Sequence, residues 1–214
     1  MNNLVQVPRL RLETNEYIEL IIHEIVRNNQ FVNGPHINMF KEHISKIFGN
    51  KSCALVANGF AGLFLTLKAL KLSNKRILVP SLSTCFAIVN AVIAVGSTPV
   101  FCPLDKKDLS LDLNAAKRIK SDVGFDAIIL VSHFGIPTDV AKFKALNVPV
   151  IEDAAQALLT RTAINSDADA TIFSLYPTKY LNAIDGGIIL ANDTIIAEIN
   201  DISYYDNQLV FDGK

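Results

Sequence analysis

Short apolar runs recur along the chain and alternate with segments whose apolar residues have helical spacing. In the clearest run, 127–131, every residue is apolar. Such runs are typical of strands buried on both faces, which occur in parallel sheets covered by helices on both sides. The pattern predicts an α/β fold, a three-layer sandwich with a mostly parallel central sheet. Strands are expected at 53–57, 76–80, 98–102, 126–132, 148–152, 168–175 and 187–191.

Helical patterns separate these runs, and two of them precede the first strand. We expect the chain to form a single domain over 1–214, with the helical segment 1–50 packed on it. Ligands in such sheets bind at the carboxyl ends of the strands, so the residues just after each strand are the candidates for chemistry. Helices are expected at 15–28, 37–48, 59–72, 84–95, 113–120, 138–146 and 195–203.

Charge and composition exclude several classes of protein. The net charge is -1, 19% of residues are charged, and no basic stripe is visible, which argues against a nucleic-acid partner. Segment 1–13 does not resemble a signal peptide, and the longest apolar stretch, 86–96, is too short to span a membrane. We therefore expect a cytoplasmic protein with no membrane partner.

Three cysteines are present, and they lie far apart in apolar surroundings: Cys53, Cys85 and Cys102. An odd number of distant cysteines argues against a disulfide framework and against a metal site with paired ligands. Buried thiols in a reducing compartment are the simplest interpretation. We expect no metal site.

A carboxylate follows the buried run near residue 150, where 150–156 reads Val-Ile-Glu-Asp-Ala-Ala-Gln. Burying a carboxylate is costly unless it meets a cation or strong hydrogen-bond donors. Asp153 could cap a helix, for which aspartate is well suited. Alternatively, it could face a protonated ring nitrogen of a cofactor such as pyridoxal phosphate (PLP), whose pyridinium acts as an electron sink. The sequence leaves both interpretations open.

A lysine closes another strand segment, Phe-Ser-Leu-Tyr-Pro-Thr-Lys at 173–179. Lys179 could be an ordinary surface residue, the commonest fate of lysine. However, a lysine at the carboxyl end of a strand and near a phosphate site is also what Schiff-base chemistry requires. Ser174, upstream on the same segment, could offer its hydroxyl to a phosphate.

The segment 58–62, Asn-Gly-Phe-Ala-Gly, lies between an expected strand and an expected helix. Backbone N–H groups at the start of a helix bind phosphate, and small residues allow it to approach. Small residues at a helix start also occur for packing alone, so this segment by itself is a weak signal.

Taken in order, these segments resemble the DegT/DnrJ/EryC1/StrS family of PLP-dependent nucleotide-sugar aminotransferases. The Glu-Asp-Ala-Ala-Gln and Ser-x-Tyr-Pro-Thr-Lys pieces are the most specific. The resemblance runs from about residue 31 to near the C-terminus and includes 58–61, 79–92, 99–105, 133–137, 151–156, 173–179 and 185–187.

The resemblance implies the large domain of a fold type I PLP enzyme and a role for each site residue. Lys179 would form the Schiff base with PLP and move the proton at the substrate carbon. Asp153 would pair with the ring nitrogen, and Gln156 would lie near the phenolic oxygen. An aromatic ring usually stacks on the cofactor, and Phe86 is the candidate here, with Cys85 the alternative. The phosphate would be held by Ser174, the backbone of Phe60 and Ala61, and the neighbouring Gly59.

The sequence also departs from the family. Phe60 stands where the family usually has threonine or serine, so a hydroxyl contact to phosphate is lost. Family members continue for well over a hundred residues beyond this point, and we expect their C-terminal small domain to be absent here. The substrate set is therefore expected to be less complete than the cofactor set.

The resemblance implies an aminotransferase that acts on a nucleotide-linked keto sugar, with glutamate as donor, in cell-surface polysaccharide or amino-sugar biosynthesis. A homodimer is expected, because these active sites are built at dimer interfaces. The alternative is a truncated PLP-binding paralogue, or a subunit that needs a partner chain. The family's dehydratases tend to have histidine in place of the lysine, so Lys179 argues against that activity. A nucleotide-binding α/β domain is disfavoured because no glycine fingerprint follows a strand.

Overall fold

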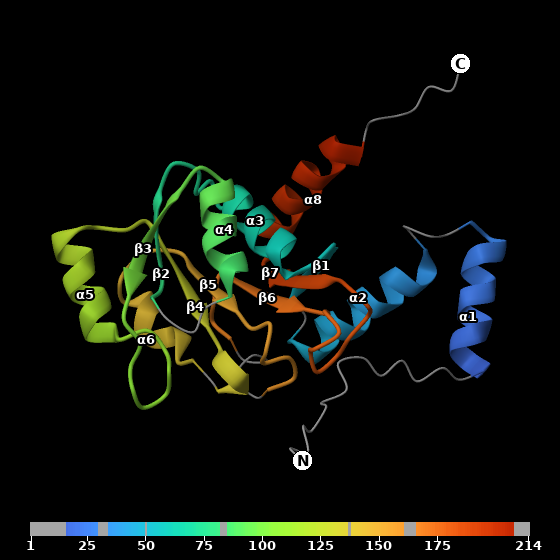
Figure 1. Cartoon of the computed structure of the whole chain (residues 1–214). Coiled ribbons are helices and arrows are strands. Elements are labelled where there is room, and N and C mark those ends of the chain that lie inside the picture. Colours follow the sequence, from blue (N-terminus) through green and yellow to red (C-terminus); the bar gives the residue numbers. More distant parts are fainter. Residues whose placement is uncertain are drawn as a thin grey trace, which may run out of the picture.

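The computed structural model describes residues 16–29, 34–49, 51–81, 85–136, 138–160 and 166–207. Seven strands in this part of the chain form one sheet, in the order β1-β7-β6-β5-β4-β2-β3 (Figure 1). β7 pairs antiparallel with β1 and β6, and the remaining pairs are parallel. The strands are β1 (Ser52–Val56), β2 (Arg76–Pro80), β3 (Thr98–Cys102), β4 (Ala127–Val131), β5 (Val150–Asp153), β6 (Ala170–Ser174) and β7 (Gly187–Ala191).

Helices cover both faces of this sheet, which confirms the predicted three-layer α/β sandwich (Figure 1). A short 3₁₀ turn, η1 (His133–Gly135), follows β4. The helices are α1 (Glu16–Arg27), α2 (Pro35–Ile47), α3 (Gly59–Ala69), α4 (Phe86–Ala94), α5 (Leu113–Asp122), α6 (Val140–Lys144) and α8 (Asp193–Asn207).

Alternate residues of the central strands enter two different cores, because successive side chains in a strand point to opposite faces. Ile129 and Ile151 pack with α3, α4 and α8 on one face. Ile128 and Val150 pack with α5 and α6 on the other. The uninterrupted apolar runs in the sequence follow directly from burial on both faces.

The two N-terminal helices differ in how they meet this domain. Ile44 of α2 and the following Phe48 are buried against β6 and β7, where the Phe48 and Phe173 ring centroids lie 5.1 Å apart. α1 has no buried residue. It lies apart from the sheet in Figure 1, and Glu24 of α1 contacts His36 of α2 at 3.6 Å. Among the described residues before β1, α2 and Phe48 carry the packing on the sheet.

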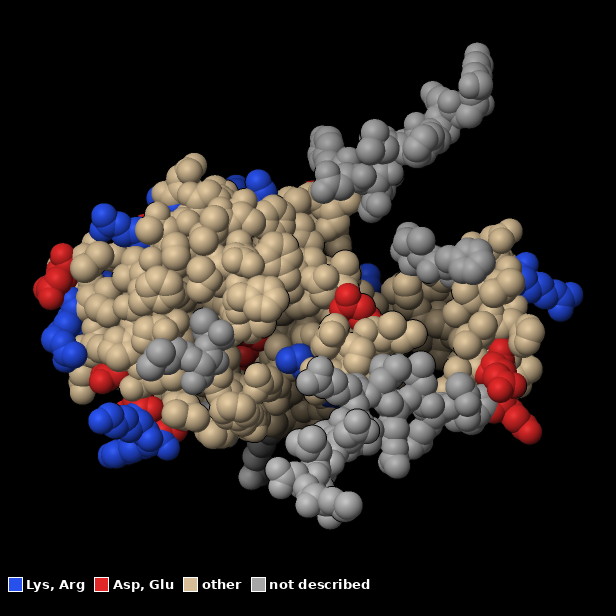
Figure 2. All heavy atoms as spheres, in the orientation of Figure 1, with Lys and Arg blue, Asp and Glu red and all other residues tan. Residues whose placement is uncertain are grey.

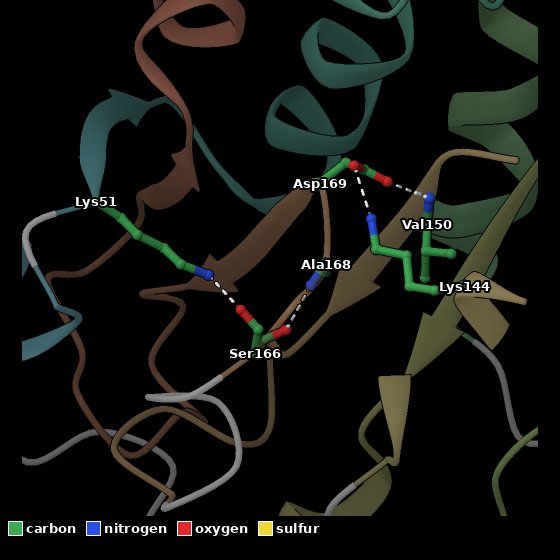
Figure 3. A network of polar contacts seen from close by, with 6 residues as sticks. All are labelled: Lys51, Lys144, Val150, Ser166, Ala168 and Asp169. Atoms are coloured by element: carbon green, nitrogen blue, oxygen red, sulfur yellow. Dashed lines mark hydrogen bonds and ion pairs between the residues drawn. The ribbon is translucent and has the colours of Figure 1, made fainter. Parts of the chain in front are cut away.

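A polar network joins elements at the amino-terminal edge of the sheet (Figure 3). Asp169 Oδ2 accepts a hydrogen bond from the Val150 N–H at 2.7 Å, and Asp169 Oδ1 pairs with Lys144 Nζ at 2.8 Å. Lys51 Nζ donates to the carbonyl of Ser166, whose hydroxyl accepts from the Ala168 N–H at 3.3 Å. The network ties the start of β6 to β5, α6 and the residue before β1.

Most predicted elements are found within two residues of their expected ends. The strands at 76–80, 98–102 and 187–191 agree residue for residue. The helix expected at 59–72 ends at Ala69 because Lys71 has a φ of 56°, and a left-handed residue ends a helix. The expected starts at residues 15 and 84 lie outside the described residues.

Candidate functional site

A cavity of about 540 Å³ lies at the carboxyl ends of β4, β5 and β6, beside the first residues of α3 and α4. This is the edge of the sheet where ligands were expected. Among its lining residues are seven that the sequence singled out for the cofactor, together with Cys85. The seven are Gly59, Phe60, Phe86, Asp153, Gln156, Ser174 and Lys179.

Asp153 ends β5, and the pleat of the strand directs it into this cavity. Ile151, two residues earlier, packs against α3 and α4, and Asp153 has the same parity along the strand. Its side chain is buried, and Oδ1 accepts a hydrogen bond from the Ala155 N–H at 3.0 Å. Glu152 points to the opposite face and accepts from the Ser132 hydroxyl at 2.6 Å.

The Asp153 carboxylate has little compensation for its burial. Desolvation raises its pKa from 3.8 to about 6, while the Ala155 N–H and the charge of Lys179 oppose the shift and the charge of Glu152 adds to it. No ion pair to Asp153 is found among the described residues. A buried carboxylate of this kind can accept a cationic donor from a ligand.

Lys179 lies in the turn that follows β6, where its N–H donates to the Tyr176 carbonyl at 2.8 Å. Its side chain is half-buried and lines the cavity. Ser174, the last residue of β6, is buried and also faces the cavity. The lysine and the hydroxyl therefore lie at one strand end, as the sequence predicted.

The start of α3 closely approaches the end of β6 and the start of β7. A Cβ atom on Gly59 would lie 3.4 Å from Ser174 Cβ, and one on Gly187 would lie 2.6 Å from the Asn58 carbonyl oxygen. Within the described residues, the N–H groups of Gly59 and Phe60 donate no hydrogen bond. Two free N–H groups at a helix start, beside a serine hydroxyl, form a site suited to phosphate.

Ala61 is placed differently from the other predicted site residues. Its N–H donates to Asn58 Oδ1 at 2.9 Å, and it does not line the cavity. The reason is local: Asn58 caps α3, and its side chain takes the N–H at the third helical position. The N–H groups left for a phosphate are those of Gly59 and Phe60.

Phe86 and Cys85 both line the cavity at the start of α4. Phe86 is the first helical residue and its ring is 76% exposed, while Cys85 precedes the helix. The structure brings both candidates to the cavity, but only the phenylalanine has a flat ring that could stack on another ring.

The lining residues absent from the predicted site set include His133 and Asp185. His133 is 2% exposed, and its Nε2 has no hydrogen-bond partner among the described residues. Desolvation lowers the pKa of this histidine, which favours the neutral ring. Both residues belong to segments quoted for the family resemblance, and His133 follows a strand, but sequence spacing gave neither a specific role.

Gln156 lies in the turn after β5 and meets η1. Its Oε1 accepts a hydrogen bond from the Phe134 N–H at 2.8 Å. The residues after β4 and β5 are thus joined at the cavity, a contact between segments that are 22 residues apart.

Comparison with known proteins decides the family. The sequence model of the DegT/DnrJ/EryC1/StrS aminotransferase family matches residues 13–205. The chain belongs to this family.

Among curated relatives, the spore coat polysaccharide biosynthesis protein SpsC of Bacillus subtilis is 30% identical over 185 residues, covering 82% of this chain and 46% of SpsC. The chain spans about half the length of the curated relatives it matches.

Two solved structures illustrate the shared fold. DesI, solved with its TDP-sugar product, is 22% identical, with a TM-score of 0.84 over 98% of this chain and 55% of DesI. NtdA of Bacillus subtilis, solved with the cofactor PMP bound, is 22% identical, with a TM-score of 0.79 over 95% of this chain and 49% of NtdA. The predicted fold type is confirmed by these neighbours.

Proposed function

We propose that the cavity binds PLP and that the chain belongs to an aminotransferase acting on a nucleotide-linked keto sugar. The observation that carries the proposal is the buried Asp153 carboxylate, which forms no ion pair among the described residues and lies in the same cavity as Lys179. The polar groups of the cavity fit the cofactor. They are a carboxylate for the ring nitrogen, an amine for the aldehyde, and free N–H groups for the phosphate.

Each group in this cofactor site has a separate task. PLP, when bound, withdraws electrons from the substrate carbon. Asp153 would hold the proton on the ring nitrogen, and Lys179 would bind the cofactor aldehyde covalently. Once the substrate amine had displaced it, Lys179 would be free to move the proton at the substrate carbon. The N–H groups of Gly59 and Phe60 and the hydroxyl of Ser174 bind the phosphate. Gln156 would bind the phenolic oxygen, and Phe86 would cover one face of the ring.

Glutamate as amino donor and a role in surface polysaccharide synthesis are further parts of the proposal. The relative SpsC is a spore coat polysaccharide biosynthesis protein, which supports the second part. We also propose that the chain forms one cofactor-binding domain and acts in the cytoplasm. In support, the three cysteines are free thiols. In the described part of the chain, no helix is long and apolar enough to cross a bilayer.

We propose that the site is completed by a second copy of the chain. Lys179 is the one cation among the described lining residues of the cavity, too little charge for a diphosphate or a dicarboxylate. Apolar side chains are exposed on several segments that line the cavity, as expected of an interface. They are Phe60, Phe86, Phe134, Tyr176, Tyr180 and Ile184. In Figure 2, most charged side chains lie toward the left and right edges of the face in view, and only a few lie near its middle.

The same shortage of cations favours the second candidate function, a PLP-binding subunit that needs a partner chain for turnover. The two candidates differ in the half-reaction with an amino donor. An aminotransferase should convert bound PLP to its amine form when glutamate is added, with the change followed by absorbance. A subunit that needs a partner chain should bind PLP but leave the spectrum unchanged by glutamate.

The first test is covalent attachment of PLP. We expect the purified chain to bind PLP with a yellow absorbance, and borohydride reduction followed by peptide mapping to place the label on Lys179. Lys179→Ala should remove the label, whereas Lys142→Ala, at an exposed lysine of α6, should retain it. Labelling of the Lys179→Ala variant at wild-type level would refute the assignment.

A further inference from the structure

The turn after β4 has an unusual backbone at the edge of the cavity. Phe134 has a φ of 54° and a ψ of 22°, and Gly135 has a φ of 78°. A left-handed conformation is unfavourable for a residue with a bulky side chain. The ring of Phe134 is 72% exposed, so its own packing does little to offset this cost. Strain of this kind, located at a site, points to a role for the backbone.

Contacts on both sides of Phe134 hold the turn in place. His133 is buried, and its carbonyl accepts a hydrogen bond from the Ile136 N–H at 2.7 Å. A Cβ atom on Gly135 would lie 3.6 Å from the Gln156 carbonyl oxygen, so the turn packs directly on the segment after β5. The left-handed residue directs its N–H to Gln156 Oε1, 2.8 Å away.

This hydrogen bond fixes which end of the Gln156 amide is available to a ligand. A backbone N–H can only donate, so the atom facing Phe134 must be the amide oxygen. The other end is the NH₂ group, which can only donate. Gln156 lines the cavity with an exposed side chain, and its free end is therefore a donor and not an acceptor.

We propose that the main chain of Phe134 is a positioning group that acts through Gln156, holding its amide oxygen so that the NH₂ group is presented to an anionic oxygen of the ligand. The inference rests on the proposed function, in which that oxygen is the phenolic oxygen of PLP. It predicts a rule for position 156: the side chain must accept a hydrogen bond from Phe134 and donate one to the cofactor.

Three substitutions at Gln156 separate these two requirements. Gln156→Glu keeps the acceptor for the Phe134 N–H but loses the donor, so PLP should bind about tenfold more weakly or worse. Gln156→His should bind PLP more tightly than Gln156→Glu, because a neutral imidazole has one acceptor and one donor nitrogen. Gln156→Leu loses both groups and should bind as weakly as Gln156→Glu.

Two measurements report on positioning rather than on stability. In Gln156→Glu, absorbance of bound PLP should change form at a higher pH, because a carboxylate disfavours an anionic oxygen nearby. In the cofactor-free protein, the Phe134 amide should exchange its hydrogen slowly in the wild type and in Gln156→Glu. It should exchange rapidly in Gln156→Leu, where its acceptor is gone.

A matched pair of substitutions tests the turn itself. Phe134→Asn and Phe134→Val both remove the exposed ring and keep the N–H. Asparagine tolerates a left-handed backbone, whereas a β-branched residue does not. PLP affinity should stay near that of the wild type in Phe134→Asn and fall about threefold to tenfold in Phe134→Val, in proportion to the loss of the left-handed turn.

The outcomes distinguish the inference from the proposed function. If the wild-type chain binds no PLP, the proposed function is wrong and the inference, which rests on it, fails with it. If the wild type binds PLP but Gln156→Glu binds it equally well, the inference alone is overturned. Equal affinities of Phe134→Asn and Phe134→Val, or rapid exchange of the Phe134 amide in the wild type, would also overturn it.

Discussion

At the scale of single residues, Asp153 shows how binding and stability oppose each other in this fold. The residue is 7% exposed, and desolvation by burial raises the pKa of its carboxyl group to about 6. The native chain therefore holds a proton more tightly than the unfolded chain, for which the ordinary value is 3.8. A group kept for a cationic ligand is costly when the ligand is absent.

The linkage has a definite sign. Between pH 3.8 and about 6 the native state binds more protons than the unfolded state, so stability of the cofactor-free chain falls as pH rises through this window. We expect Asp153→Asn to stabilise the cofactor-free protein by up to roughly 3 kcal/mol at about pH 8, and by much less near pH 4. Urea unfolding at both pH values measures this, and an equal gain at both would contradict it.

The same substitution should weaken PLP binding, because a neutral amide cannot pair with a protonated ring nitrogen. Titration of the two proteins with PLP under identical buffer provides the check. A gain in stability together with a loss of affinity would separate a functional carboxylate from a purely structural helix cap.

The sequence located single residues where their position along a strand determines what they face. Asp153 and Ser174 were predicted to lie at the ends of buried strands and Lys179 after one, and the structure places them there. The N–H of Ala61 is taken by the side chain of Asn58, a contact that composition does not reveal. The contact of Phe134 with Gln156 depends on the left-handed backbone of Phe134. Because a left-handed conformation is not expected of phenylalanine, the sequence pattern could not predict this contact.

At the scale of elements, the two ends of the parallel strands have different tasks. The carboxyl ends of β4, β5 and β6 surround the cavity. The network around Asp169 and Lys51 joins the elements at the amino ends of β5 and β6 (Figure 3). Elements were predictable here because burial on both faces leaves a plain apolar signal. The contacts of Asp169 and Lys51, in contrast, join residues 19 to 115 positions apart in the sequence.

We expect Asp169→Ala to lower the free energy of unfolding by about 1–2 kcal/mol, because it removes the acceptor for both the Val150 N–H and Lys144. PLP affinity should not change. Asp139→Ala is the control, since Asp139 pairs with Lys142 on the exposed surface of α6 and should cost about 0.5 kcal/mol or less. Chemical denaturation of the three proteins compares them, and equal losses for both variants would show that the network adds no stability.

At the scale of the whole molecule, we expect the exposed apolar side chains around the cavity to be covered by a second copy of the chain. We expect light scattering to give twice the 23.4 kDa mass of the chain. Tyr180→Glu places a charge on an 84% exposed ring next to Lys179 and should shift the assembly toward monomer. Ile93→Glu, on a 57% exposed residue of α4 outside the cavity lining, is the control. A wild-type monomer at all concentrations would contradict the proposal.

The separation of the cavity from the Asp169 network has a practical meaning for anyone who redesigns this chain. Strands of four or five residues place the two ends of the sheet roughly 15 Å apart, so changes at one end act almost independently of changes at the other. Substitutions that alter substrate choice tend to erode robustness. Here a loss of stability can be compensated by stabilising substitutions at the amino-terminal edge of the sheet, so that the cavity can be altered in laboratory evolution.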